Sequence, residues 1–229
     1  MTKTPIDGSM LLAFQHVDSQ FPSGGFAFSQ GLEATSQLAD LLGDVDFASF
    51  LTMQIRHRWA EADRVALVRA HRLRGDLSAL AVLDAEVEAS TFMEGLRLGS
   101  RRNGTALLTA HARIGTPGAT SYRMMIRTGS AHGHLPVVQG LLWQALDLDE
   151  ATVVAISGYQ AVSSLTTAAL RLGLIGAIDA QRMITGVLSM IQELGAVAIR
   201  DDEPICSFIP LVEVAVALHG AKGQRLFSN

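Results

Sequence analysis

Apolar residues recur at helical spacing along almost the whole chain, and this periodicity of about 3.6 residues predicts α-helices. No stretch shows the strict alternation of apolar and polar residues that is typical of a half-buried strand. The predicted helices cover residues 9–20, 26–42, 44–73, 76–93, 120–130, 135–147, 150–174, 178–199 and 209–220. We therefore expect an all-α fold, a single-domain helical bundle of about ten helices over residues 1–229. Its two ends, residues 1–8 and 221–229, are expected to be flexible tails.

Capping residues and prolines mark where several of these helices begin. Either Asp44 or Asp46 can accept hydrogen bonds from the first turn of the third helix. Asp76 or Ser78 can do the same for the fourth. Two prolines suit first helical turns, where no backbone N–H is needed: Pro136 and Pro210.

Glycines predict an interruption between residues 94 and 114. Gly95, Gly99 and Gly104 each weaken a continuous helix there, by about 1 kcal/mol relative to alanine. A break in this region is therefore expected. The clearest turn follows directly, in the sequence Gly-Thr-Pro-Gly at residues 115–118.

Composition and charge restrict the function more than the fold. Of the 229 residues 48% are hydrophobic and only 17% are charged, which favours burial of apolar surface against partners. A net charge of −4 argues against nucleic acid as a partner, because proteins that bind it carry a basic face. The single cysteine, Cys206, excludes an internal disulfide. No N-terminal stretch has the order of a signal peptide, so we expect a cytoplasmic protein.

Residues 151–170 carry no charge and are numerous enough to cross a membrane. Polar side chains interrupt this span at Ser157, Tyr159, Gln160, Ser163, Ser164, Thr166 and Thr167. A helix at the centre of a bundle fits this composition better than a lipid-facing helix, so no membrane partner is expected. A membrane-associated regulator that uses this span is an alternative.

Sequence patterns of nucleotide sites and of catalytic sites are absent. A phosphate-binding loop ends in Gly-Lys-Ser/Thr, and neither of the two lysines, Lys3 and Lys222, follows a suitable glycine run. The patterns G-x-G-x-x-G, G-x-S-x-G and HExxH do not occur. We therefore expect no catalytic residue and no cofactor.

His132-Gly133-His134 contains the one close pair of histidines. On a helix the two imidazoles would diverge, so they could share a metal only in an extended or looped backbone. No thiolate or carboxylate lies nearby in the sequence, and closed metal sites usually take four ligands. We assign no metal ligand, and keep an all-α metal-dependent enzyme built on His132 and His134 as the alternative function.

Arginines gather in the third predicted helix, interleaved with Glu61 and Asp63. They are Arg56, Arg58, Arg64, Arg69, Arg72 and Arg74. The pattern fits either a solvated, salt-bridged face or a surface that docks on an acidic partner. Arg97, Arg101 and Arg102 allow the same two interpretations.

Residues 21–33, with the sequence FPSGGFAFSQGLE, form the most distinctive stretch of the chain. Pro22 biases Phe21 toward an extended backbone, so the first helix is expected to end at or before Phe21. Gly24 and Gly25 allow positive φ or a close approach of another backbone. We expect a tight corner that leads into a helix, and an ordinary helix–loop–helix turn would have the same features.

The corner contains the pattern Pro-x-Gly-Gly-Phe-x-x-Ser-x-Gly-Leu-Glu, which resembles the N-terminal signature of the urease accessory protein UreF family. Two later blocks resemble this family in the same order. The mid-chain block consists of Arg171, Leu172, Gly173, Gly176 and Gln181. The C-terminal block consists of Pro210, Leu211, His219, Arg225, Leu226, Phe227 and Ser228. The resemblance spans nearly the whole chain.

The resemblance implies an all-α, dimeric urease maturation protein that is not an enzyme. Such a protein joins a UreD (UreH)-type protein and the GTPase UreG, regulates the GTPase and helps to load nickel into apo-urease. Some members of the family are implicated in a nickel passage to the UreD-type partner. The partner-binding residues implied here are Pro22, Gly24, Gly25, Phe26, Ser29, Gln30, Glu33, Arg171, His219, Gln224, Arg225, Leu226 and Phe227.

Two segments depart from the family pattern. Residues 91–96, Thr-Phe-Met-Glu-Gly-Leu, are less charged than this region usually is. Ala221-Lys222-Gly223 replaces an aromatic residue near the end of the chain. The tail itself ends on Arg225, Leu226 and Phe227, which either fold back on the core or present an arginine–aromatic cluster to a partner.

Overall fold

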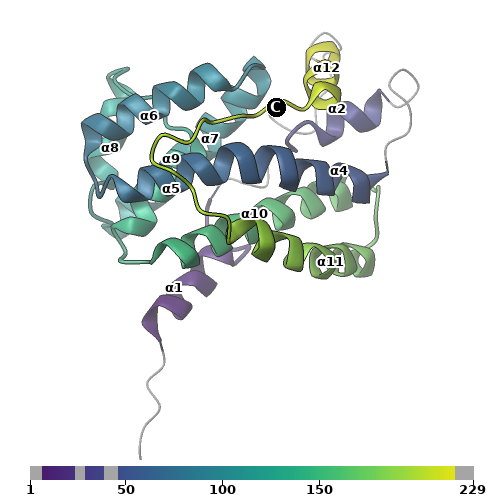
Figure 1. Cartoon of the computed structure of the whole chain (residues 1–229), viewed down its shortest axis with the longest axis horizontal. Helices are drawn as coiled ribbons and strands as arrows, with labels where there is room; N and C mark the ends of the chain where they lie inside the picture. Colours follow the sequence, from purple (N-terminus) through teal and green to yellow (C-terminus); the bar gives the residue numbers. More distant parts are fainter. Residues whose placement is uncertain (1–6, 24–28, 39–45, 220–229) are drawn as a thin grey trace, which may run out of the picture.

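A continuous helical rod runs through the middle of the computed structural model, which describes residues 7–23, 29–38 and 46–219 (Figure 1). The rod consists of α4 (Phe47–Met53), the π-helical segment η2 (Gln54–Asp63) and α5 (Arg64–Arg72). Asp46 caps it by accepting a hydrogen bond from the backbone N–H of Ser49 at 3.0 Å. The predicted long third helix is therefore confirmed.

The other helices surround this rod. They are α1 (Gly8–Val17), α2 (Leu32–Gln37), α6 (Leu77–Ser90), α7 (Glu94–Ile114), α8 (Ala119–Arg127), α9 (Leu135–Gln144), α10 (Glu150–Arg171), α11 (Ala177–Gly195) and α12 (Pro210–His219). In Figure 1, α6, α7 and α8 lie toward one end of the rod, α2 and α12 toward the other, and α10 and α11 below it. With the rod counted as one helix, the described residues form ten helices and no strand, which confirms the all-α bundle.

Apolar side chains from both ends of the molecule join in one core. The buried cluster extends from Leu32 in α2 to Val216 in α12, and its largest fully buried side chains include Trp59 and Trp143. In the part of the chain that the structure describes, α10 is the one helix long and apolar enough to cross a membrane. It packs against α1, α5 and α11, and 56% of its most apolar window is buried, as in a core helix.

The predicted break between residues 94 and 114 is wrong, because α7 is continuous from Glu94 to Ile114. Gly104 explains the error. A Cβ atom at this position would lie 2.1 Å from the carbonyl oxygen of Gly133 and 3.0 Å from the backbone nitrogen of Leu135. The glycine lets the segment before α9 pack against the helix, and this packing outweighs the low helix propensity of glycine.

The predicted second helix, residues 26–42, is shorter in the described residues. Helix α2 begins only at Leu32, because Gln30 and Gly31 have positive φ angles of 52° and 85°. Such angles lie outside the right-handed helical region, so residues 29–31 belong to the corner. The remaining parts of that prediction, at residues 26–28 and 39–42, lie outside the described residues.

Arginines of α5 hold the segment that follows α11. Arg72 makes a two-pronged ion pair with Glu150 at 2.8 Å and also donates to Asp201. Arg69 makes a second two-pronged pair, with Glu86 at 2.7 Å, and donates to the carbonyl of Glu203. These bonds attach residues 199–203 to the C-terminal part of the rod.

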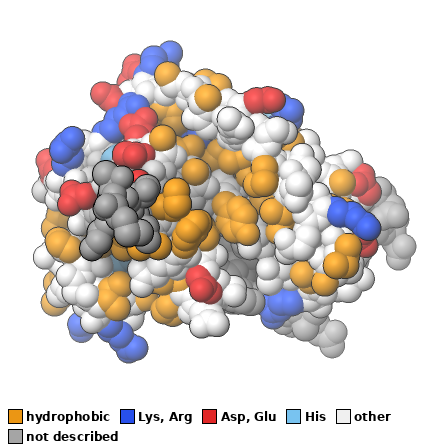
Figure 2. All heavy atoms as spheres, turned by 90° about the horizontal axis from the view of Figure 1, so that it is seen from below, with side chains coloured by type: hydrophobic (Ala, Val, Ile, Leu, Met, Phe, Trp, Pro, Cys, Tyr) orange, Lys and Arg blue, Asp and Glu red, His pale blue; other side chains and the backbone are white. Residues whose placement is uncertain are grey.

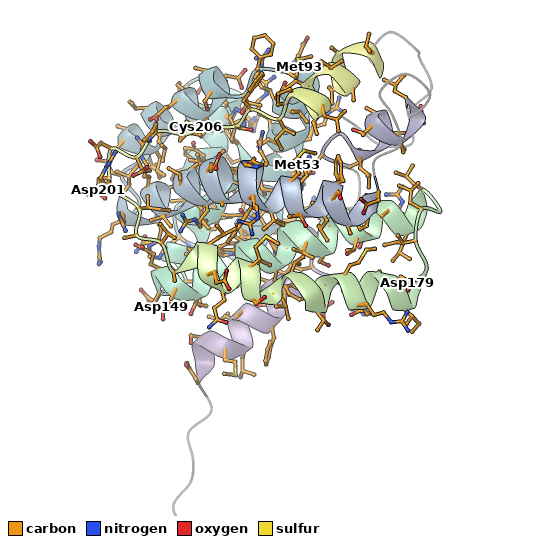
Figure 3. The ribbon with its side chains drawn as sticks, turned by 45° about the vertical axis from the view of Figure 1, so that its right-hand side comes forward. Met53, Met93, Asp149, Asp179, Asp201 and Cys206 are labelled. Atoms are coloured by element: carbon orange, nitrogen blue, oxygen red, sulfur yellow. The ribbon has the colours of Figure 1, made fainter. Side chains whose placement is uncertain are left out.

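The same segment then runs back along the rod toward α12. The backbone N–H of Cys206 donates to the carbonyl of Glu61, and Arg58 donates to the hydroxyl of Ser207 at 2.9 Å. Figure 3 shows Asp201 and Cys206 on this extended stretch in front of the central helix. Of the two interpretations of the arginine-rich helix, the salt-bridged one therefore holds for Arg58, Arg69 and Arg72. Arg56 and Arg74 are exposed.

The carboxylate of Asp84, fully buried in α6, organises the loop between α8 and α9. It accepts hydrogen bonds from the backbone N–H groups of His132, Gly133 and His134 at 2.6–3.0 Å. The hydroxyl of Tyr122 donates a fourth bond at 2.9 Å. Burial, together with the neighbouring carboxylate, raises the pKa of Tyr122, so the phenol keeps its proton. Asp84 thereby fixes the loop just before α9 begins.

Candidate functional site

The corner at residues 21–33 packs directly against the C-terminal helix. A Cβ atom on Gly31 would lie 2.6 Å from Cγ1 of Val212, so only glycine allows α12 to approach this closely. The side chain of Gln54 in η2 donates to the carbonyl of Gln30 at 3.0 Å. Gly31 of the N-terminal block thus packs against α12, the helix that carries Pro210, Leu211 and His219, although about 180 residues separate Gly31 from Val212 in the chain.

The predicted partner-binding residues differ in their accessibility. Pro22 is exposed, and so is Arg171 at the end of α10. Ser29 and Glu33 are fully buried, and Gln30 is half-buried. His219 is the last residue of α12. The others, Gly24, Gly25, Phe26, Gln224, Arg225, Leu226 and Phe227, lie outside the described residues.

A cavity of about 150 Å³ lies beneath the corner. Its wall includes side chains from six helical elements, from α1 to α12, and from the segments between them. Its polar lining includes His16, Gln54, Arg58, Asp63, Asn103, Gln139, Ser157, Gln160, Ser164 and Glu213. Several of these bind one another: Gln139 donates to Gln160 at 2.8 Å, and Gln160 donates to the carbonyl of His16 at 2.6 Å. The cavity therefore has a largely prearranged polar wall.

The charged groups that line this cavity are the carboxyl groups of Asp18, Asp63 and Glu213 and the guanidinium of Arg58. Nε of Arg58 lies 3.1 Å from Oδ1 of Asp63. Glu213 is 6% exposed, and its Oε2 has no hydrogen-bond partner. Burial raises the pKa of the Asp63 and Glu213 carboxyl groups, against the opposing charge of Arg58. The arrangement can hold a proton or a polar group, and it contains no paired nucleophile and base among the described residues.

Two buried imidazoles stack beside the cavity. The ring centroids of His16 and His111 are 5.2 Å apart, and Phe21 packs against both rings. Neither Nε2 atom has a hydrogen-bond partner. Burial lowers the pKa of His16, and it lowers the pKa of His111 to about 4. Both rings are therefore neutral at pH 7 and behave as core side chains.

Acid is expected to destabilise the fold through His111. Its pKa is about 4 in the folded state and about 6.5 when unfolded, so the unfolded chain binds more protons between these values. Stability should therefore fall by about 2 kcal/mol from pH 7.5 to pH 5 through this group. Urea unfolding of the wild type and of His111→Phe across this range measures the effect. His57→Gln, at an exposed imidazole, is the control, and an equal pH slope in all three proteins would contradict the prediction.

His132 and His134 lie in a loop that hydrogen bonds within the protein hold in place. The loop holds the two ring centroids 6.2 Å apart. His134 is fully buried, with Nδ1 3.1 Å from the hydroxyl of Ser100 and Nε2 2.8 Å from Oε2 of Glu88. Burial would raise the pKa of Glu88, but the bond from His134 and the charge of Arg101 lower it overall. Both ring nitrogens of His134 are thus engaged within the protein.

A metal centre on this pair gains no support from the geometry. Over residues 7–23, 29–38 and 46–219, no three His, Cys, Asp or Glu side chains are arranged to hold a metal ion. Glu88 contacts His134 and lies 3.8 Å from Nδ1 of His132, but it does so as an acceptor in a buried network. The alternative of a metal-dependent enzyme therefore loses its proposed ligands.

Sequence reasoning missed the residues of the cavity and the role of Asp84. Glu213 offered a signal, because it is the one charged residue in the apolar run from Ile209 to Leu218. Asp84 offered a similar but weaker one, since it lies between Leu83 and Val87 on the apolar side of its helix. No local pattern joins Arg58 to Ser207, which are 149 residues apart.

The fold is all-α, and the corner and the C-terminal helix meet at a polar cavity. Among the described residues, this cavity contains no paired nucleophile and base. Comparison with known proteins agrees: residues 43–188 match the UreF family model. The urease accessory protein UreF of Trichodesmium erythraeum is 29% identical over 223 residues, covering 96% of each chain. UreF 1 of Brucella melitensis is 31% identical over 227 residues, covering 96% of this chain and 92% of its own.

The UreF of Yersinia enterocolitica is 27% identical over 225 residues, covering 96% of this chain and 98% of its own. The chain therefore belongs to the UreF family of urease accessory proteins. The family is named for an accessory role, so the protein is not an enzyme, and the enzymatic alternative is excluded.

Proposed function

We propose that this protein is a scaffold for urease maturation, which joins a UreD (UreH)-type protein and the GTPase UreG and so delivers nickel to apo-urease. The observation that carries the proposal is the match over nearly the full chain to proteins named urease accessory protein UreF. The packing of Gly31 against Val212 supports it, because it brings one residue of the N-terminal block against the helix that carries Pro210, Leu211 and His219 of the C-terminal block. The site of action is the cytoplasm, in keeping with nickel loading of a newly made enzyme.

Self-association is part of this proposal. Apolar side chains gather on the face seen from below, formed by α1 and α11 (Figure 2). Met10, Leu11 and Phe14 of α1 are more than half exposed, as is Ile178 of α11. An exposed apolar face of this kind favours an isologous homodimer, the commonest symmetric assembly.

Co-purification tests the scaffold role. The chain is produced with the UreD-type protein and UreG encoded in the same genome, and the products are separated by size with light scattering. We expect a complex that contains all three proteins, and a mass of about twice 24.4 kDa for the chain alone. Absence of any complex at about 10 µM of each protein, a concentration at which a stable interface is occupied, would contradict the proposal.

Arg225→Ala tests the contribution of the chain end. A desolvated arginine anchor contributes on the order of 2 kcal/mol, so the variant should bind the UreD-type partner about thirtyfold more weakly with an unchanged melting temperature. Phe227→Ala should act similarly and non-additively. Arg182→Ala, at an exposed arginine of α11, is the matched control. Full binding by Arg225→Ala would show that the tail does not contribute to the interface. A large fall in melting temperature would show instead that the tail packs on the core.

A further inference from the structure

Positive charge is segregated in the middle of the chain. Residues 95–146 contain six arginines and no aspartate or glutamate. Because the whole chain carries a net charge of −4, the remaining residues carry −10. The arginines are Arg97, Arg101, Arg102, Arg113, Arg123 and Arg127, and all of them lie on α7 or α8. A local field of this sign persists within about 8 Å in physiological salt, so it acts on molecules that contact these helices.

A groove of about 700 Å³ runs along α7 within this basic region. Arg101 and Arg102 flank one end, and Arg113 flanks the other. Arg102 and Arg113 are eleven residues apart, which places them on the same side of the helix at a separation of about 16 Å. Between them the groove is lined mainly by small and apolar side chains: Leu98, Thr105, Ala106, Thr109, Ala110 and Ile114, with Phe21 and Pro22 opposite.

The arginines at the two ends are available for binding. Arg102 and Arg113 are exposed, and neither has an ion pair or a side-chain hydrogen bond in the described part of the protein. Arg101 is half-buried and lies 3.5 Å from Glu88. Ile114 is 62% exposed and lines the groove together with Leu98 and Ala110, so these side chains form one apolar surface rather than a single exposed residue.

We propose that this α7 groove binds an acidic, amphipathic helix of a protein partner. A helix laid along α7 can place apolar side chains against the groove floor and carboxylates against the arginines at both ends. Carboxylates about three helical turns apart match the spacing of Arg102 and Arg113. The apolar floor favours such a segment over nucleic acid, whose phosphates would gain nothing from Leu98 and Ile114. This assignment does not depend on the proposed nickel delivery.

A designed peptide tests the groove on the full-length protein. The probe is a rhodamine-labelled helix of about 18 residues, with glutamates about eleven residues apart and leucines between them. A matched peptide carries glutamine in place of glutamate. In fluorescence anisotropy at about 50 mM salt, the glutamate peptide should bind at least about tenfold more tightly, and this preference should shrink at about 500 mM salt.

Replacing groove arginines with glutamate tests whether the peptide binds in the groove or is attracted only by the net charge of the protein. Arg102→Glu with Arg113→Glu should weaken binding of the glutamate peptide by about tenfold or more. Arg56→Glu with Arg182→Glu makes the same change in net charge at exposed positions outside the groove, and should weaken it less than about twofold. Thr105→Trp, at an exposed position in the groove lining, should weaken both peptides without changing the charge. Melting curves confirm that each variant is folded.

Three results would overturn the proposal. The first is equal affinity for the glutamate and glutamine peptides. The second is equal weakening by the groove pair and the control pair, which would reduce the effect to net charge. The third is tighter, Arg102- and Arg113-dependent binding of a DNA duplex or of anionic lipid vesicles, which would assign the groove to a different class of partner.

Discussion

Replacing Asp84 with alanine is expected to lower the free energy of unfolding by about 3 to 5 kcal/mol. The carboxylate is fully buried and accepts four hydrogen bonds, three from consecutive backbone N–H groups and one from Tyr122. Without it, these four donors stay buried and lose their common acceptor. The loss should also loosen the loop at residues 131–134, and with it the bond between His134 and Glu88.

Urea unfolding measures this effect. Asp84→Asn should lose less than Asp84→Ala, because its amide oxygen still accepts some of the four bonds. Asp76→Ala is the control on the same helix, where an exposed carboxylate caps Ser78 and Ala79 and should contribute only about 1 kcal/mol. A loss for Asp84→Ala no larger than that for Asp76→Ala would show that the loop is not held in this way.

Sequence patterns predicted those helices and helix ends that depend on residues close to one another in the chain. Helical periodicity identified the rod and the helices around it, and Asp46 and Asp76 cap their helices as expected. Pro136 and Pro210 lie in first turns, also as predicted. In each case the interacting groups are within a few residues of one another, so the sequence alone contains the necessary information.

The prediction failed where a distant segment decides the outcome. Gly104 weakens a helix when considered alone, yet it is required because the backbone of Gly133 lies against it. The arginines of the rod were expected to form salt bridges or to dock on a partner, but their partners in residues 199–207 could not be named, since these lie more than 120 residues away. Spacing within one helix cannot identify such partners, and tertiary packing overrides propensity at these positions.

The candidate site was predicted in part. The family signature selected the corner and the C-terminal block, and the contact between Gly31 and Val212 of α12 was not predicted from the sequence. Burial of Ser29 and Glu33 was not foreseen, because both are polar in a segment rich in glycine. The polar cavity was missed because its lining comes from six helical elements with no common sequence pattern. Partner binding stays a prediction for the corner residues, for Arg171 and His219, and for the residues of the tail.

Loss of this protein is expected to leave urease with little nickel. A scaffold that holds the nickel donor beside apo-urease raises the local concentration of the donor, an effect that can reach about 10²- to 10⁴-fold. Urease made without the scaffold should therefore fold and assemble but remain largely metal-free and inactive. Restoring the chain should restore both nickel content and activity, and Arg182→Ala should restore them as well as the wild type does.

The nickel content of purified urease tests the central claim most directly. The urease subunits and the other accessory proteins of the same genome are produced in a heterologous host, with or without this chain, and nickel per active site is measured by mass spectrometry. The scaffold role predicts near-stoichiometric nickel with the chain and loss of most of it without the chain. Equal nickel content in the two preparations would contradict that role.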